Sequence, residues 1–320
     1  MAPILKRYGA PFDSLRWVPL GSGGGFSGAE LWRGEGEGVP LFALKAWPRS
    51  MAADRLAEIH RWMAKASHLE FVPEVMKMRD GSTLVEASGR IWDLTRWMPG
   101  TADYHANPGA PRLANACTAL AELHRAWRPA SPRFTSCPAV ARRLQILANW
   151  RAADIHLPMP LDLLRRGSAA VARLIEPAER ALRPCADRPV LVQPCLCDIW
   201  HDHILFSGAA VTGIIDFGAM KEDHLAVDLA RMLGDLAGED EEKFHLGLNA
   251  YRAASGETDL PYEFVRLLDR TGVVCSMIVW LLRWTANSRQ FAEDRAAVDR
   301  VERVVDRIEA IRGCPRFPPS

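Results

Sequence analysis

The sequence predicts an α+β fold in which a small antiparallel β-sheet with one helix precedes a larger, mainly helical region. Short apolar segments separated by turn residues fill residues 15–97, as in a sheet of short strands. From Leu113 onward, apolar side chains recur at helical spacing. Within this helical region, residues 195–218 predict a β-hairpin that has one acidic residue before it and one after it.

The overall composition is that of a globular protein. The chain has 320 residues, of which 48% are hydrophobic and 25% are charged, and this is enough to build two lobes. Its formal net charge of +1 gives no electrostatic reason to expect nucleic acid or an anionic membrane as a partner. We therefore expect a small-molecule partner, with no nucleic acid and no membrane.

Cysteine usage and the lack of a targeting signal favour the cytoplasm. The 7 cysteines, an odd number scattered along the chain, fit free thiols better than a disulfide framework. The N-terminus has no apolar core of signal-peptide length, and the most apolar window, residues 273–282, is too short to span a bilayer. We therefore expect a cytoplasmic protein.

The first two predicted strands flank a glycine cluster. Residues 15–20 and 39–47 have strand composition, and Lys45 lies in the second segment. Glycines between strands let the backbone approach a ligand closely, most often a phosphate, although a flexible turn is the alternative interpretation. The cluster comprises Gly21, Gly23, Gly24, Gly25 and Gly28.

One helix and three further strands complete the predicted sheet region. Residues 52–68 place Leu56, Ile59 and Met63 at helical spacing, with Glu58 in the middle of the helix. The further strands are predicted at residues 71–78, 83–86 and 90–97. The later helices are predicted at residues 113–127, 140–150, 169–182, 226–236, 241–254, 264–285 and 295–312.

The predicted hairpin brings two carboxylates to its open end. Asp198 lies in a polar loop before the apolar patch 204–206, and Asp216 follows the apolar run 211–215. The pair Ser207-Gly208 supplies the turn between the two strands. Two carboxylates placed in this way can share a metal ion, or one can take a proton while the other holds the metal.

The order of these features resembles that of protein-kinase-like enzymes, in particular the aminoglycoside phosphotransferase and choline kinase branch. The resemblance rests on a glycine-rich turn, a strand lysine, a helix acid, a Pro-Gly link and the segments around the hairpin. Those segments are Leu196-Cys197-Asp198, His203, Ile215-Asp216-Phe217-Gly218 and residues 223–230, DHLAVDLA. It implies a bilobal fold with a nucleotide-binding N-lobe at residues 1–95. Residues 96–320 would form a helical C-lobe that carries the catalytic loop, the metal-binding Asp and the substrate site.

The resemblance also implies a role for each matching residue. Asp198 corresponds to the catalytic-loop acid that accepts or orients the proton of the substrate hydroxyl. Asp216 corresponds to the metal ligand, and Asp228 to an acid that supports the catalytic loop. Lys45 would reach the nucleotide phosphates while pairing with Glu58.

The same resemblance implies a nucleotide site formed by the glycine cluster and the segment that links the two lobes. Thr95 and Trp97 lie in that segment, whose backbone would meet the nucleotide base. The cofactors implied are ATP or GTP with Mg²⁺, with Mn²⁺ as an alternative. Asp228 lies only ten positions after Gly218. Because this leaves no room for a peptide-binding activation segment, we expect a phosphotransferase that acts on a hydroxyl of a small molecule.

One position departs from the family pattern. The loop Asn that serves as a second metal ligand is replaced by His203. Mg²⁺ prefers oxygen ligands, whereas imidazole suits Mn²⁺, Zn²⁺ and similar ions. His203 therefore is either a ligand of a softer ion, a hydrogen-bond donor to Asp216 or a phosphate, or a mark of lost catalysis, and the neighbouring acid Asp202 offers a replacement oxygen.

Two other functions compete with the kinase interpretation. One is a catalytically silent nucleotide-binding module, which would retain Lys45 and Asp216 without turnover. The other is a zinc site, for which Cys195, Cys197, His201 and His203 have suitable ligand types but an unfavourable spacing on one short segment.

The sequence does not identify the phosphoryl acceptor. An acid-rich segment could bind a polycationic aminoglycoside, or it could be the solvated start of a helix. Trp280, Arg283, Trp284 and Arg289 could wall a substrate pocket, although a core stripe is the commoner explanation for the two tryptophans. The acids of the segment are Asp235, Glu239, Asp240, Glu241 and Glu242.

Overall fold

The computed structural model describes residues 1–9, 11–21, 28–152, 162–257, 260–286 and 295–312. It confirms the α+β class. Packing divides the chain into two compact units, of which the first joins Met1–Trp127 to His201–Met220 and the second joins Arg128–Trp200 to Lys221–Ser320. The division expected after residue 95 runs inside the first unit, because the β-hairpin packs with residues that follow position 95.

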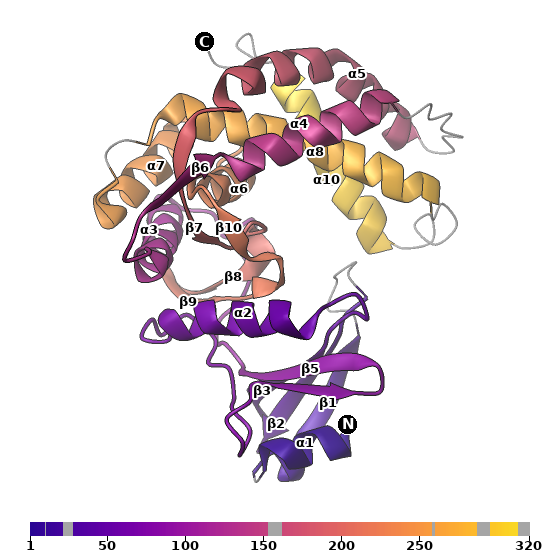
Figure 1. The fold of residues 1–320 in the computed structure, drawn as a ribbon, viewed down its shortest axis with the longest axis vertical. Coiled ribbons are helices and arrows are strands. Elements are labelled where there is room, and N and C mark those ends of the chain that lie inside the picture. The colour runs from indigo at the N-terminus through magenta and orange to yellow at the C-terminus, as the bar shows by residue number, and fades with distance from the viewer. Residues whose placement is uncertain (10, 22–27, 153–161, 258–259, 287–294, 313–320) are drawn as a thin grey trace. The chain divides into compact units, whose positions relative to one another are not determined.

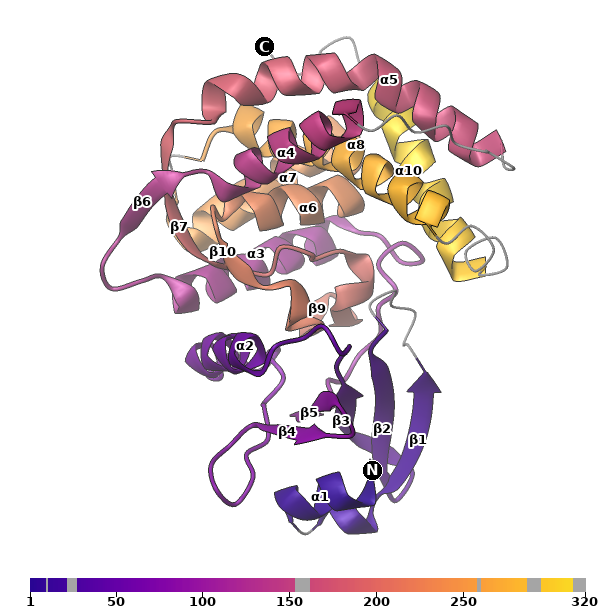
Figure 2. The ribbon, with the colours of Figure 1, turned by 45° about the vertical axis from the view of Figure 1, so that its right-hand side comes forward.

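A five-stranded antiparallel sheet forms the frame of the first unit (Figure 1), and its strand order is β1-β2-β3-β5-β4, with β4 labelled in Figure 2. Glu37 and Gly38 connect β2 to β3, and both have positive φ, as a tight two-residue hairpin turn requires. The strands are β1 (Arg16–Gly21), β2 (Glu30–Gly36), β3 (Val39–Ala46), β4 (Leu84–Ala87) and β5 (Arg90–Arg96).

Two helices pack against this sheet. Helix α1 (Ala2–Tyr8) buries Ile4 and Leu5 against a core that includes Leu44 and Leu94, and the short 3₁₀ helix η1 (Phe12–Ser14) follows it. Helix α2 (Ala53–Lys65) buries Leu56, Ile59 and Met63, which confirms the predicted apolar face.

The strand predicted at residues 71–78 is wrong. Only an isolated bridge between Val75 and Thr95 forms there. Pro73 explains the difference, because a proline lacks the backbone N–H that a continuous strand must donate.

The β-hairpin forms as predicted, from β8 (Ile204–Ser207) and β9 (Ala210–Ile214). It packs against helix α3 (Ala110–Trp127), where Asn115 Nδ2 donates a hydrogen bond of 2.9 Å to the Ala209 carbonyl. A bridge between Thr101 and Phe206 joins the hairpin to the segment after β5. The 3₁₀ turns η3 (His201–His203) and η4 (Phe217–Ala219) begin and end this part of the first unit.

The second unit is a helical assembly with a small sheet that the sequence did not reveal. Strands β6 (Arg133–Ser136), β7 (Pro189–Cys195) and β10 (Lys221–Asp223) form an antiparallel sheet in the order β10-β7-β6. Helix α8 packs against α4, α5, α6 and α10 (Figure 2). The helices are α4 (Pro138–Ala152), α5 (Asp162–Leu182), α6 (Ala226–Leu236), α7 (Glu241–Ser255), α8 (Tyr262–Ala286) and α10 (Arg295–Arg312), with the 3₁₀ turn η2 (Arg183–Cys185) before β7.

None of the helices in the described ranges combines the length and the apolar character that a membrane span requires.

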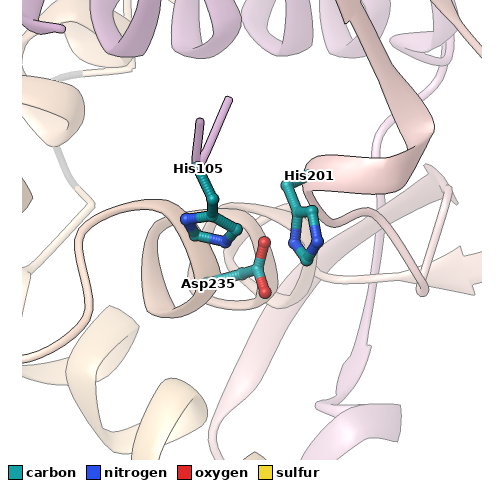
Figure 3. Close-up of side chains that lie close together, drawn as sticks. All are labelled: His105, His201 and Asp235. Carbon is teal, nitrogen blue, oxygen red and sulfur yellow. The ribbon is translucent and has the colours of Figure 1, made fainter. Parts of the chain in front are cut away.

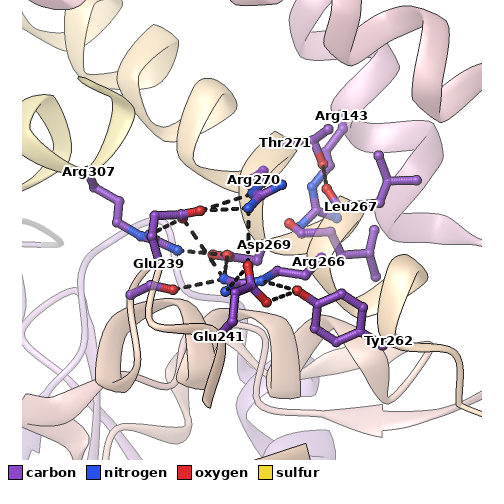
Figure 4. Close-up of polar contacts among 12 residues, drawn as sticks. Arg143, Glu239, Glu241, Tyr262, Arg266, Leu267, Asp269, Arg270, Thr271 and Arg307 are labelled. Carbon is purple, nitrogen blue, oxygen red and sulfur yellow. Dashed lines mark hydrogen bonds and ion pairs between the residues drawn. The ribbon is translucent and has the colours of Figure 1, made fainter. Parts of the chain in front are cut away.

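A buried ion network joins α8 to its neighbours in the second unit (Figure 4). The fully buried Arg266 guanidinium donates to Asp269 at 3.1 Å and to the Gly238 carbonyl at 2.8 Å. A Cβ atom at Gly234 of α6 would lie 1.9 Å from Asp269 Oδ1, so only glycine allows this approach of the two helices. Arg307 of α10 also donates to Asp269, at 2.7 Å.

Replacing Arg266 with Met tests this network. The substitution leaves the buried Asp269 with Arg307 and removes the donor to Gly238, so we expect a loss of about 3 kcal/mol in the free energy of unfolding. Chemical denaturation followed by tryptophan fluorescence measures it. The control is Arg295→Met, because Arg295 is 85% exposed and its pair with Asp299 should be worth less than about 1 kcal/mol. Equal effects at the two positions would contradict a structural role for the network.

Candidate active site

The glycine cluster lies between β1 and β2. Gly21 and Gly28 have φ values of 63° and 76°, in the left-handed region that favours glycine. Gly23, Gly24 and Gly25 fall outside the described residues. A Cβ atom at Gly21 or Gly28 would meet no heavy atom within 4 Å, so backbone conformation accounts for glycine at these two positions.

Lys45 on β3 meets the acid that follows the hairpin. Its Nζ atom donates a hydrogen bond of 3.0 Å to Asp216 Oδ1. The same ammonium group lies 4.0 Å from the ring centroid of Trp47. Residues 171 positions apart in the chain are thus joined by a charge-assisted bond.

The ion pair expected between Lys45 and Glu58 is not formed. Glu58 instead pairs with Arg55, one helical turn earlier, at 2.6 Å. The reason is competition, since Lys45 already meets Asp216 and Arg55 neutralises Glu58 locally.

A histidine anchors α2 to the sheet. His60 Nε2 lies 3.0 Å from Asp93 Oδ2, and its Nδ1 lies 2.8 Å from Thr83 Oγ1. Asp93 is the cross-strand partner of Lys45. Sequence reasoning missed this contact, although His60 lies four residues after Leu56 and therefore on the apolar face of the helix.

The two residues expected to meet the nucleotide base lie at the end of β5. Thr95 is the cross-strand partner of Ala43, and the Trp97 N–H donates a hydrogen bond of 2.9 Å to the Leu41 carbonyl. Both residues therefore continue the strand that carries Asp93, and their part in base binding stays a prediction.

Asp216 combines an unusual backbone conformation with an accessible side chain. Its φ of 61° is left-handed, and its side chain is 47% exposed. Burial favours the neutral acid, but the charges of Lys45 and His203 outweigh it and hold the pKa of the Asp216 carboxyl below its ordinary value. A Cβ atom at Gly218 would lie 2.8 Å from the Trp47 ring, so glycine is needed where the chain turns after Asp216.

The two histidines of η3 have different surroundings. His203 Nε2 lies 3.8 Å from Asp216 Oδ2. The ring of the buried His201 packs at 4.2 Å, centroid to centroid, against the ring of His105 (Figure 3). One carboxylate and one imidazole next to each other are a donor set that fits a divalent cation, with a preference for ions softer than Mg²⁺.

In the second unit, Asp228 fixes the loop before Asp198. Its carboxylate is fully buried and accepts hydrogen bonds of 2.6 Å from the backbone N–H groups of Leu196 and Cys197. Cys197 has a φ of 64°, a conformation that costs energy for a residue other than glycine. The two hydrogen bonds offset that cost and set the direction in which the chain enters Asp198.

Asp198 itself is accessible and faces an arginine. Its side chain is 49% exposed, and Arg231 Nε lies 3.4 Å from its Oδ1 atom. Sequence reasoning missed Arg231, although its position three residues after Asp228 places both on one face of α6.

The cysteines proposed as zinc ligands are packed in the second unit. Cys195 Sγ donates weak hydrogen bonds to the carbonyls of Gln193 and Asp223, at 3.5 and 3.4 Å. Burial raises the pKa of the Cys195 and Cys197 thiols. This disfavours the thiolate form that zinc requires.

Most of the acid-rich segment is used within the second unit. Glu239 pairs with Arg270 at 2.7 Å, and Glu241 pairs with Arg266 at 3.0 Å (Figure 4). Asp240 caps α7 by accepting a hydrogen bond from the Lys243 N–H. The segment is therefore a structural feature more than a surface for cations. Trp280 and Trp284 are buried, which supports the core interpretation of both.

Known proteins with related sequences are named homoserine kinases. The one from Methylobacterium radiotolerans is 27% identical over 217 residues, which cover 66% of this chain and 64% of the relative. The one from Bradyrhizobium diazoefficiens is 25% identical over 225 residues, covering 68% and 65% of the two chains. These matches span less than two thirds of the relatives' own length.

Solved structures share the fold at low sequence identity. Spectinomycin phosphotransferase APH(9)-Ia, in complex with ADP and spectinomycin, has a TM-score of 0.66 and 14% identity and covers 93% of both chains. A choline/ethanolamine kinase family protein from Mesorhizobium loti has a TM-score of 0.62 and 18% identity, covering 96% and 91%. Both confirm the protein-kinase-like fold class.

The family itself follows from a match that covers most of the chain. Residues 19–268 match the model of the "Phosphotransferase enzyme family". This range contains Lys45, Asp198, Asp216 and Asp228, around which the resemblance was built. The chain belongs to the phosphotransferase enzyme family.

Proposed function

We propose that this protein transfers the terminal phosphoryl group of ATP or GTP to a hydroxyl of a small molecule. The observation that carries the proposal is the anchoring of the Asp198 loop. Each carboxylate oxygen of the buried Asp228 accepts a hydrogen bond from the backbone of that loop, and the Asp198 carboxylate is accessible. A fixed, accessible carboxylate is what a general base for a hydroxyl requires.

The first unit would bind the nucleotide. The glycine turn at Gly21 and Gly28 offers backbone N–H groups to phosphate oxygens. Lys45 carries the charge that reaches them, and its Asp216 partner keeps the ammonium in place until the nucleotide arrives. Thr95 and Trp97 would present backbone groups to the base.

Asp216 and His203 would hold the divalent cation, for which we propose Mg²⁺ or Mn²⁺. A bound cation neutralises charge on the nucleotide phosphates. The charges of Lys45 and His203 lower the pKa of the Asp216 carboxyl, which favours the ionised form that a cation binds. His203 contributes a nitrogen where an oxygen ligand would suit Mg²⁺ better.

Asp198 would accept or orient the proton of the acceptor hydroxyl, and Arg231 would hold the carboxylate in position. The relatives' name makes homoserine one acceptor to test.

The six described cysteines are free thiols, which is consistent with the cytoplasmic location that we propose.

Replacing Asp198 with Asn tests the proposed function. The substitution keeps the shape of the side chain but removes its basicity, so we expect phosphoryl transfer to fall by about 10²- to 10⁴-fold with nucleotide affinity unchanged. The assay is ADP or GDP release across a panel of hydroxyl acceptors, and calorimetry measures nucleotide binding. Nucleotide binding without turnover in the unmodified protein would instead indicate a catalytically silent module.

Replacing Lys45 with Met tests the nucleotide half of the site. The variant loses a charge-assisted contact to phosphate, so we expect nucleotide affinity to fall by about 10- to 150-fold. Equilibrium titration of a non-hydrolysable nucleotide measures it. Lys65→Met is the matched control, because Lys65 is an exposed lysine at the end of α2. Retained affinity in Lys45→Met would remove Lys45 from the nucleotide site.

Replacing His203 with Asn tests the cation site. Removal of the imidazole restores an oxygen ligand, so the ratio of Mn²⁺-supported to Mg²⁺-supported activity should fall several-fold. Initial rates at saturating concentrations of each ion give this ratio. The exposed His68 supplies the control variant His68→Asn. An unchanged ratio would mean that His203 does not contact the cation.

A further inference from the structure

Three arginines gather around Trp200 and Asp198 in the second unit. Arg231 lies on α6 and contacts Asp198, while Arg300 and Arg303 lie about one turn apart on α10. The guanidinium carbon of Arg300 lies 3.4 Å from the ring centroid of Trp200, and that of Arg303 lies 5.6 Å from it. Stacking on an indole fixes the plane of a guanidinium group and leaves its N–H donors free to point outward in that plane.

The positive charge of this cluster exceeds the negative charge that faces it. The pKa of Arg300 is lowered to about 10, mainly by burial. The positive charges of Arg231 and Arg303 also lower this pKa, whereas the negative charges of Asp198 and Asp235 raise it. In the described part of the chain, neither Arg300 nor Arg303 forms an ion pair with a carboxylate. Three cations thus face two anions, and one of those anions is the carboxylate assigned to the acceptor hydroxyl.

We propose that Arg300 and Arg231, with Trp200 as their support, form a subsite for a carboxylate of the acceptor. This rests on the proposed function, because Asp198 marks where the acceptor hydroxyl would lie. A planar guanidinium fork matches the two oxygens of a carboxylate and binds them with paired hydrogen bonds. The acceptor would therefore be a hydroxy acid or hydroxy amino acid.

The carboxylates of the second unit argue against a polycationic acceptor. A site for an aminoglycoside needs acids that are available to ammonium groups. Glu239 and Glu241 are committed to Arg270 and Arg266, and Asp240 caps a helix. Around Asp198, the guanidinium groups of Arg231, Arg300 and Arg303 outnumber the carboxylates of Asp198 and Asp235. A carboxylate would relieve the repulsion among Arg231, Arg300 and Arg303, whereas an ammonium group would add to it.

The test compares acceptors that differ only in the carboxylate. The matched pairs are 4-hydroxybutyrate with 4-hydroxybutyramide, and L-homoserine with L-homoserinamide. At saturating nucleotide, the unmodified protein should favour the carboxylate member of a pair by about tenfold or more in kcat/KM. Arg300→Gln should bring this preference close to onefold, because the KM of the carboxylate acceptor rises by about tenfold or more while the nucleotide KM stays unchanged. Arg300→Lys, which keeps the charge but loses the fork, should fall between the two.

Arg295→Gln is the matched control for this experiment. Arg295 lies in the first turn of the same helix, is 85% exposed and pairs with Asp299. The control should retain the full preference for the carboxylate, and the unfolding transitions of all variants must match that of the unmodified protein. A variant that fails to match is replaced by Arg303→Gln, for which a smaller loss of preference is expected because Arg303 lies farther from Trp200.

Calorimetry with the same four compounds separates this inference from the proposed function. Turnover of the amides at least as fast as of the acids would overturn the carboxylate subsite and leave the kinase function standing. Tighter binding of the acids than of the amides, without any turnover, would support the carboxylate subsite and overturn the kinase function. An Arg300→Gln variant that changes the nucleotide KM instead of the acceptor KM would assign the arginines to nucleotide phosphate and overturn the inference. The inference would also be overturned if none of the four compounds binds or reacts.

Discussion

The candidate site depends on the hydrogen bonds that the Asp228 carboxylate makes with the loop before Asp198. A fully buried carboxylate is costly unless its oxygens have partners, and here each oxygen accepts one backbone N–H. The same bonds hold Cys197 in a left-handed conformation. If the loop relaxed, the buried Asp228 carboxylate would lose these hydrogen-bond donors. Because α6 carries both Asp228 and Arg231, one helix sets the course of the loop and supplies the cation that faces Asp198. That helix is in turn held against α8, where Gly234 admits Asp269 to the network of Arg266.

In the first unit, a single ion pair has a comparable part. Lys45 belongs to the sheet and Asp216 to the end of the hairpin, and each restricts the other. The Lys45 charge lowers the pKa of the Asp216 carboxyl against the effect of burial, and the left-handed backbone at Asp216 aims its carboxylate back toward β3. With Lys45 engaged in this way, α2 is secured to the sheet by different chemistry, the contact of His60 with Asp93. Glu58 therefore does not form the ion pair with Lys45 that the resemblance implied, and it pairs with Arg55 instead.

Local pattern predicted the parts of the fold that repeat regularly along the chain. The longer helices and the hairpin have enough turns or alternations for the pattern to show, whereas the seven-residue helix α1 was not predicted. The spacing of Asp198, Asp216 and Asp228 was informative because it lies within about thirty residues of chain. The sheet of β6, β7 and β10 was missed because β6 is four exposed residues and β10 only three, too short for any periodicity. The strand predicted around Val75 failed because one proline outweighs an apolar composition. The partners of Glu58, His60 and Arg231 were not predictable in the same way, since each depends on which side chains tertiary packing brings together.

Charge illustrates this limit most clearly and bears directly on the acceptor. In the sequence, the acids of residues 235–242 could form a surface for cations or the solvated start of a helix, and nothing singles out Arg300 and Arg303. In the folded second unit the situation is reversed, because arginines neutralise Glu239 and Glu241 internally, and Arg300 is stacked on Trp200 beside Asp198. Family membership concerns the chemistry of phosphoryl transfer, which the order of Lys45, Asp198 and Asp216 along this chain would serve. On the carboxylate subsite proposed above, the choice of acceptor depends instead on the charges that folding gathers around Asp198, where three arginines face two carboxylates.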